Sequence, residues 1–253
     1  MLGFDIVGTG AHRVIVLNDW LCDTSTWASA RPYLDRDAFA WAFADVRGYG
    51  RSREQRGTFT VEEAAADVLA LADELAWAQF SVVGHSMSTI AALHLAQTSA
   101  ERITSAVLVT PPPPASFHYD EATQTALREV ALGDDTRRAR ALEVMLGSRL
   151  SPAWLRFKLE RWRATSDPHA VAGYLPMFGV SGVPDLTTRL ACPVLAITGD
   201  EDALPMRREA AAQNLAPLCS QLTLVSIPGC GHYPMQETPP HFVALVEKFL
   251  AGR

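Results

Sequence analysis

Short apolar runs recur along the chain and alternate with segments in which apolar and polar positions have helical spacing. The apolar runs are rich in β-branched residues and predict strands at residues 2–7, 13–18, 39–44, 79–84, 103–109, 193–198 and 222–227. The intervening segments predict helices at residues 24–34, 61–76, 87–99, 206–215 and 238–250. This alternation predicts an α/β fold with a mostly parallel central sheet flanked by helices on both faces.

The stretch 111–188 departs from the alternation. It opens with consecutive prolines, Pro111 to Pro114, which end the preceding strand because proline continues neither a helix nor a sheet. Helical patterns follow at residues 121–132, 135–146, 152–165 and 168–178. We therefore predict that residues 111–188 form a four-helix lid over the carboxyl edge of the sheet. The lid is inserted into a core made of residues 1–110 and 189–253.

Aromatic and histidine side chains in the predicted lid are candidates for lining an apolar pocket. They are Phe117, His118, Tyr119, Trp154, Phe157, Trp162, Tyr174 and Phe178. We expect Trp154, Phe157 and Tyr174 to line the pocket, together with His85 and Tyr233 from the core. The alternative is that such side chains only pack the lid against itself and against the core.

A serine lies at the junction of a predicted strand and a predicted helix. The sequence Gly84-His85-Ser86-Met87-Ser88 follows the apolar run 79–83 and precedes the small, apolar helical run 89–97. Small residues around a serine at such a turn are typical of a nucleophile elbow, in which backbone strain exposes the hydroxyl. The motif by itself is short and a buried turn serine is the alternative, but the flanking strand and helix favour a nucleophile at Ser86.

A nucleophilic serine needs a base and an acid that orients the base, and the chain has candidates for both after later strands. Asp200 and Asp202 follow the strand 193–198, and His232 follows the strand 222–227. In a parallel sheet, residues that follow strands meet at one edge, where the sites of open α/β sheets form. Serine, acid and histidine are therefore expected to converge.

These residues identify the chain as resembling the α/β-hydrolase fold, and the resemblance covers nearly the whole length. The loop 45–52, the segment Gly199 to Asp202 and the sequence Gly231-His232-Tyr233-Pro234 match family motifs. The resemblance implies a catalytic triad of Ser86, Asp202 and His232. Asp202 is preferred over Asp200 because the family's acid stands three positions after the glycine.

The resemblance also implies where an oxyanion would be bound. One donor is the backbone amide of Met87, directly after the nucleophile, and the other comes from the loop after the strand 13–18. Here the family commonly has His-Gly-x, whereas this chain has Asn18-Asp19-Trp20, so the second donor is the amide of Trp20. A carboxylate at Asp19 opposes a developing negative charge unless it points away or is paired.

The composition of the chain argues against some classes of binding partner. The net charge of −6 argues against a nucleic-acid-binding protein, and no apolar stretch is long enough to span a membrane. The amino terminus has no secretory pattern, and the spacing of the cysteines indicates neither disulfides nor a metal site. We expect a cytoplasmic protein, a monomer or homodimer, without metal or organic cofactor.

Three functions fit these expectations. The first is a serine hydrolase of small carboxylic esters or lactones. The second is a ligand-responsive signalling protein, because the elbow and the four-helix lid are similar to those of the bacterial stress-response hydrolase and the plant butenolide receptors. The third is a cofactor-independent, non-hydrolytic enzyme on the same fold. Ser86 argues against the related dehalogenases and epoxide hydrolases, which have aspartate at this position.

Overall fold

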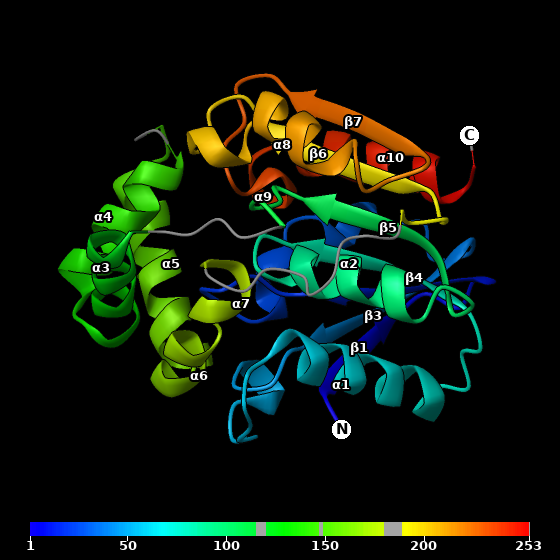
Figure 1. The fold of residues 1–253 in the computed structure, drawn as a ribbon, viewed down its shortest axis with the longest axis horizontal. Coiled ribbons are helices and arrows are strands. Elements are labelled where there is room, and N and C mark those ends of the chain that lie inside the picture. Colours follow the sequence, from blue (N-terminus) through cyan, green and yellow to red (C-terminus); the bar gives the residue numbers. More distant parts are fainter. Residues whose placement is uncertain (115–119, 147–148, 180–188, 253) are drawn as a thin grey trace.

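The computed structural model describes residues 1–114, 120–146, 149–179 and 189–252, and its centre is a seven-stranded sheet (Figure 1). The strands are β1 Gly3–Val7, β2 His12–Leu17, β3 Phe39–Asp45, β4 Phe80–His85, β5 Ile103–Val109, β6 Val194–Gly199 and β7 Leu222–Ile227. Their order is β1-β3-β2-β4-β5-β6-β7, in which β1 is antiparallel to β3 and every other pairing is parallel. The predicted strands and the mostly parallel sheet are confirmed.

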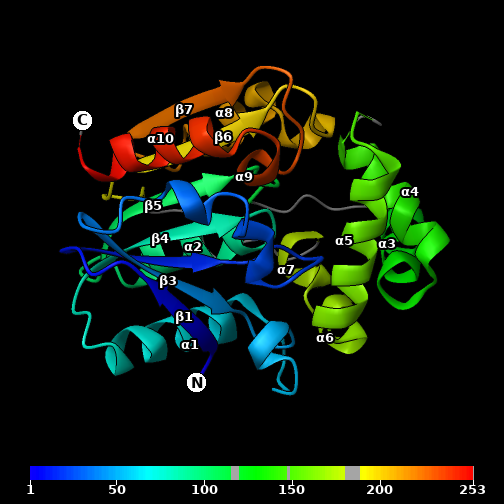
Figure 2. The same ribbon diagram turned by 180° about the vertical axis from the view of Figure 1, so that it is seen from behind.

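The central strands are apolar because helices cover both of their faces. Every residue of β3, β4 and β6 is buried, as expected for strands in the middle of a two-sided α/β sheet. One face carries α1 Val61–Glu74, α2 Ser88–Thr98 and α8 Arg208–Leu215 (Figure 1). The other carries α10 Pro239–Leu250, which follows the short α9 Pro234–Glu237 (Figure 2).

The single helix predicted at residues 24–34 is wrong. The structure has two short 3-10 helices there, η1 Thr24–Trp27 and η2 Arg31–Tyr33. Pro32 has no backbone N–H and cannot extend an α-helical hydrogen-bond ladder, so the chain forms short tight turns instead. Two further 3-10 helices, η3 Gly50–Ser52 and η4 Leu204–Met206, occur in loops after β3 and β6.

Between β5 and β6 the described chain is helical. Its helices are α3 Glu121–Leu132, α4 Asp135–Leu146, α5 Pro152–Thr165, α6 Pro168–Gly173 and α7 Leu175–Gly179. The first three match the predicted bounds, but the predicted helix 168–178 is divided at Tyr174. Pro176 explains the division, because its ring excludes the carbonyl of the residue four positions earlier from a regular helix.

Helices α3 to α7 lie beyond the carboxyl ends of the strands, as the directions of the β5 and β7 arrowheads show (Figure 1). Hydrogen bonds fasten them to the core: the amide of Asp167 donates to the carbonyl of Gly48 (2.8 Å), and Nε1 of Trp20 donates to the carbonyl of Val171 (2.7 Å). An ion pair of 2.6 Å joins Arg56 to Asp167. The site at this end of the sheet is therefore bounded by both parts of the chain.

No helix in the described part of the chain has the length and apolar character needed to cross a membrane.

Candidate active site

Ser86 occupies a strained turn between β4 and α2. Its φ of 52° lies in the left-handed region, which a residue with a side chain adopts only when its surroundings impose it. The Ser86 amide is held by the carbonyl of Val109 on β5 (2.8 Å). A Cβ at Gly84 would lie 2.5 Å from the carbonyl oxygen of Ser88, so the turn requires glycine there. This geometry is that of a nucleophile elbow.

His232 and Asp202 form a buried hydrogen-bonded pair. Nδ1 of His232 lies 2.8 Å from Oδ2 of Asp202, and both side chains are nearly inaccessible to solvent. Burial works to lower the pKa of His232, but the charge and hydrogen bond of Asp202 outweigh it, and the pKa is raised. Because Nδ1–H of His232 donates its hydrogen bond to the Asp202 carboxylate, the proton stays on Nδ1 and Nε2 is left free to act as a base.

Asp200, the alternative candidate for the acid of the triad, has a different hydrogen-bond partner. Asp200 is exposed, and its Oδ1 accepts a hydrogen bond from the amide of Gly229 (2.7 Å). The second oxygen of Asp202, by contrast, accepts from the amide of Ala203 (2.7 Å), which fixes the carboxylate that faces His232. Of the two aspartates after β6, the structure brings Asp202 to the histidine.

The loop that carries His232 is bonded to the base of the elbow. Nε2 of His85, the residue before Ser86, donates to the carbonyl oxygen of His232 (2.8 Å), and the two rings lie 5.2 Å apart. The hydroxyl of Thr110, directly after β5, donates to the same carbonyl at 3.3 Å. These bonds place His232 and the elbow together at one edge of the sheet.

The loop after β2 is bonded to the same elbow. Oγ of Ser88 donates to the carbonyl of Asn18, and Oδ1 of Asn18 accepts from the amide of Val46 (2.8 Å). Trp20 and Met87 are both buried, and neither of their amides donates a hydrogen bond to the described residues. Two amides without an acceptor at this position match the donors expected for an oxyanion.

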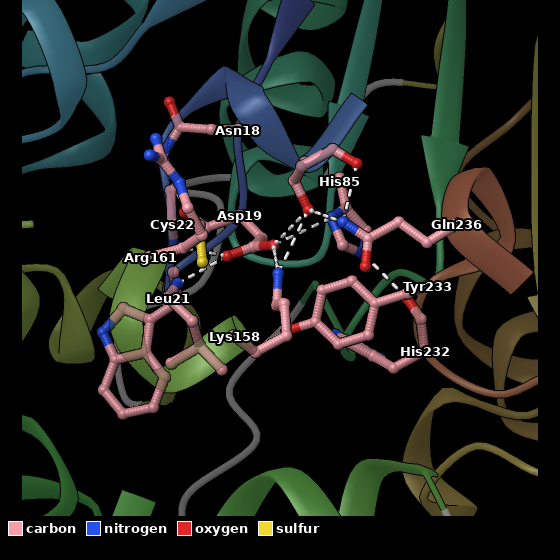
Figure 3. A network of polar contacts seen from close by, with 12 residues as sticks. Asn18, Asp19, Leu21, Cys22, His85, Lys158, Arg161, His232, Tyr233 and Gln236 are labelled. Carbon is pink, nitrogen blue, oxygen red and sulfur yellow. Dashed lines mark hydrogen bonds and ion pairs between the residues drawn. The ribbon is translucent and has the colours of Figure 1, made fainter. Parts of the chain in front are cut away.

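The carboxylate of Asp19, which stands where the family commonly has glycine, is hydrogen-bonded and ion-paired in the structure. Its Oδ1 accepts from the amides of Leu21 (2.5 Å) and Cys22 (2.9 Å). Its Oδ2 lies 3.3 Å from Nδ1 of His85 and 3.9 Å from Nζ of Lys158, whose side chain extends from α5 toward Asp19 (Figure 3). Burial opposes the charged form of Asp19, but the Lys158 ammonium, together with the hydrogen bond from the Leu21 amide, outweighs it and lowers the pKa of Asp19.

Lys158 was not among the expected site residues. Its side chain is 1% exposed, and its Nζ lies 3.3 Å from Oγ1 of Thr26 and 4.0 Å from the centre of the Tyr233 ring. The sequence nevertheless indicates that this lysine lies on the buried face of its helix. Lys158 stands four positions after Trp154 and four before Trp162, so it belongs to the inward face of α5.

The residues predicted to line the pocket differ in their exposure to solvent. Phe157 lies one position off the inward face of α5 and is 46% exposed, and its contact with a substrate stays a prediction. His85, Tyr174 and Tyr233 are fully buried, and the part-buried Trp154 packs 5.4 Å from the Tyr233 ring. For these four, contact with a substrate stays a prediction.

The other lid aromatics are also placed. Trp162 and Phe178 are buried and pack against Trp20 at centroid distances of 6.0 Å and 5.4 Å. These two side chains join the helices after β5 to the loop after β2. The remaining candidates, at 117–119, lie outside the described residues.

The chain belongs to the alpha/beta hydrolase family, whose model matches residues 14–245. Among curated proteins, none matches this sequence.

Solved structures of this fold are similar over nearly the whole chain. A thermophilic esterase from Thermogutta terrifontis is 25% identical, with a TM-score of 0.85 and coverage of 99% of this chain and 93% of the esterase. An enol-lactonase from Burkholderia xenovorans is 22% identical, with a TM-score of 0.82 and coverage of 99% and 96%. A bromoperoxidase from Bacillus anthracis is 19% identical, with a TM-score of 0.86 and coverage of 98% and 94%. The fold is therefore shared by proteins of several activities.

Proposed function

We propose that the protein is a serine hydrolase that cleaves small carboxylic esters or lactones through an acyl-enzyme intermediate. The observation that carries the proposal is the strained elbow at Ser86 beside the buried Asp202–His232 pair. An ordinary buried turn serine needs neither the strain nor a neighbouring histidine oriented by a carboxylate. Strain of this kind at a serine between a strand and a helix is typical of a nucleophile elbow.

In the proposed reaction, Nε2 of His232 takes the proton of Ser86 as Oγ attacks the substrate carbonyl. Asp202 holds the Nδ1 proton and stabilises the imidazolium that forms. The amides of Trp20 and Met87 bind the oxyanion, and a donor of this kind contributes about 3 kcal/mol in the transition state. As the tetrahedral intermediate collapses, Nε2–H of His232 gives its proton to the leaving oxygen, so the alcohol departs and an acyl group stays on Ser86. Neutral His232 then takes a proton from water as the water attacks the acyl group, and the same proton returns to Ser86 when the acid is released.

The helices α3 to α7 act in this proposal as the lid, formed by residues 111–188 and inserted into the core. Its inward aromatic side chains, such as Trp154, favour an apolar acyl or alkyl group on the substrate. The esterase and enol-lactonase of the same fold support carboxylic esters and lactones as the substrate class.

The first experiment is a turnover assay with p-nitrophenyl esters of increasing acyl length and with simple lactones, beside the variant Ser86→Ala. We expect many turnovers per enzyme, which the variant lacks, and a preference among acyl lengths that measures the pocket. A single burst of product, with Ser86 still labelled by a fluorophosphonate, would instead favour the slow, ligand-responsive signalling protein.

A non-hydrolytic enzyme is the second candidate. The similarity to a bromoperoxidase favours it, because that protein has the same fold and a different activity. Product analysis separates the two candidates. A hydrolase converts ester and water to acid and alcohol in equal amounts, whereas a non-hydrolytic enzyme does not yield this pair.

A further inference from the structure

The ion pair between Lys158 and Asp19 joins α5 to the loop that carries a proposed oxyanion donor. Asp19 directly precedes Trp20, and the adjoining Asn18 carbonyl is bonded to Ser88 at the elbow. The Asp19 carboxylate and the Lys158 side chain are both almost fully buried. Charges in such a site interact strongly with any charge that forms nearby, because little water screens them.

An unpaired carboxylate here would oppose catalysis. The proposed reaction places a negative charge on the substrate oxygen beside the amide of Trp20. Residues with a small, neutral side chain at the position of Asp19 avoid this repulsion, so the chain needs another way to remove it. Of the described residues, Lys158 and His85 lie within ion-pair distance of Asp19.

His85 is not a suitable source of positive charge. Its Nε2 carries the proton that bonds the His232 carbonyl, and burial lowers the pKa of the ring, so that it is neutral near pH 7. The neighbouring Cys22 and Tyr233 are neutral as well, because burial raises their pKa values, that of Cys22 to about 12. Lys158 is the cation that faces Asp19.

We propose that Lys158 is a positioning residue that neutralises the Asp19 carboxylate beside the oxyanion-binding amide of Trp20. The inference rests on the proposed function and adds a role for α5: the helix supplies the charge that makes this oxyanion loop competent. The amides of Leu21 and Cys22 hold one oxygen of Asp19, and Lys158 faces the other.

The variants Lys158→Met, Asp19→Asn and the double variant test the sign of the charge effect. With p-nitrophenyl acetate, we expect Lys158→Met to lose at least roughly tenfold in kcat with little change in KM, because the unpaired carboxylate acts on the transition state. Asp19→Asn should lose less. The double variant should recover most of the loss of Lys158→Met, because no carboxylate remains.

A purely structural ion pair gives a different result. Both single variants break the same pair, so they would lose kcat to a similar extent, and the double variant would be no better than Lys158→Met. Either finding overturns the inference. Circular dichroism and thermal melting identify a variant that fails to fold. If Lys158→Met does not fold, the double variant decides, because it removes both buried charges: a kcat within a few-fold of wild type supports the inference, and a loss of roughly tenfold or more overturns it.

Arg161→Met is a matched control on the same helix. Arg161 pairs with Asp23 at 3.1 Å and donates to Oγ of Ser25 at 3.0 Å, so it also fastens α5 to the loop after β2. It does not face Asp19. Its loss should leave kcat within about twofold of wild type, since a partly exposed ion pair that does not face the proposed oxyanion site contributes little to the reaction. A loss equal to that of Lys158→Met would assign the effect to helix docking and overturn the inference.

The pH dependence of kcat is a further test, because a purely structural role of Lys158 predicts no change in it. Without Lys158, burial raises the pKa of Asp19, which is then neutral at low pH and charged at high pH. The titratable groups around it are His85 from β4, Cys22 from its own loop, Tyr49 after β3, and His232 and Tyr233 after β7. The kcat of Lys158→Met relative to wild type should therefore fall as pH rises, and a constant ratio contradicts the inference.

Labelling by a fluorophosphonate separates failure of the inference from failure of the proposed function. Phosphonylation of Ser86 also places negative charge in the oxyanion site, so its rate should rank the variants as kcat does. A wild type that neither turns over esters nor reacts with the probe overturns the proposed function, and the inference with it. A reactive wild type whose variants show no such ranking overturns the inference alone.

Discussion

The carbonyl oxygen of His232 accepts a hydrogen bond of 2.8 Å from Nε2 of His85, which directly precedes Ser86. The proposed base is thus bonded through its backbone to the segment that carries the proposed nucleophile. Its side chain is oriented independently, by Asp202. Two separate contacts therefore set the position and the orientation of the imidazole.

His85→Ala should weaken both the fold and the reaction. It leaves the buried His232 carbonyl with the longer bond from Thr110 and creates a cavity, at a cost of about 2–4 kcal/mol in the free energy of unfolding. We expect kcat to fall by about tenfold or more because the base is no longer held in place. Urea unfolding and ester turnover measure the two effects.

His94→Ala is the control for that variant, because His94 lies on α2 and is only half-buried. It should change kcat little. His85→Gln, whose amide can donate to the same carbonyl, should keep more activity than His85→Ala. Equal activity of the two variants would mean that the hydrogen bond does not position His232.

Ser86→Ala and His232→Ala should each remove nearly all ester turnover, by roughly 10⁴-fold or more in kcat. The double variant should cost little more than either single variant, because nucleophile and base act as one unit. Steady-state kinetics on the best p-nitrophenyl ester measure this. Losses that multiply would show that the two residues act independently.

Asp202→Asn should reduce kcat by about 10⁴-fold, because the amide favours the wrong tautomer of His232. Asp200→Asn should have less than about a twofold effect, since the exposed Asp200 bonds only the Gly229 amide. The reverse ranking would identify Asp200 as the working acid. The two variants differ by one atom each from the natural residue, so they form a matched pair.

The rate should rise with pH through the titration of His232. The base must be neutral to take a proton, and Asp202 raises its pKa, so the acidic limb of kcat/KM should have its midpoint above the ordinary histidine value of about 6.5. The charged pair stabilises the fold below the unfolded pKa, and this contribution is lost as pH rises through the folded pKa.

The variant Asp202→Asn checks the origin of that midpoint. Without the carboxylate, burial lowers the pKa of His232, and the limb of the residual activity should move to lower pH. A midpoint that does not move would show that the limb belongs to another group.

Much of this protein follows from local patterns in the sequence. Apolar β-branched runs predicted all strands of the sheet, and the runs are most continuous in the central strands β3, β4 and β6, where both faces are buried and every position favours a side chain that can be buried. Three of the helices after β5 were predicted with their observed bounds from helical periodicity, and in the structure Asp120 and Ser151 cap two of them. Ser86 was recognisable because the elbow is itself local: Gly84, the serine and Ser88 meet within one turn.

Local patterns failed where a single residue overrides periodicity. Pro32 and Pro176 lie within helical patterns and interrupt them, at η2 and between α6 and α7. Phe157 was chosen by residue type, and its angular position on α5 leaves it 46% exposed. The errors at Pro32 and Pro176 concern information that is present in the sequence.

The sequence by itself determined the strands, the elbow and the chain order of Ser86, Asp202 and His232. Only the tertiary structure decided which aspartate meets the histidine and which cation meets Asp19. Asp200 and Asp202 follow the same strand, and their difference arises from how the loop after β7 packs on that strand. Lys158 and Asp19 lie on segments far apart in the chain, and periodicity reports only which face of a segment is buried, never its partner.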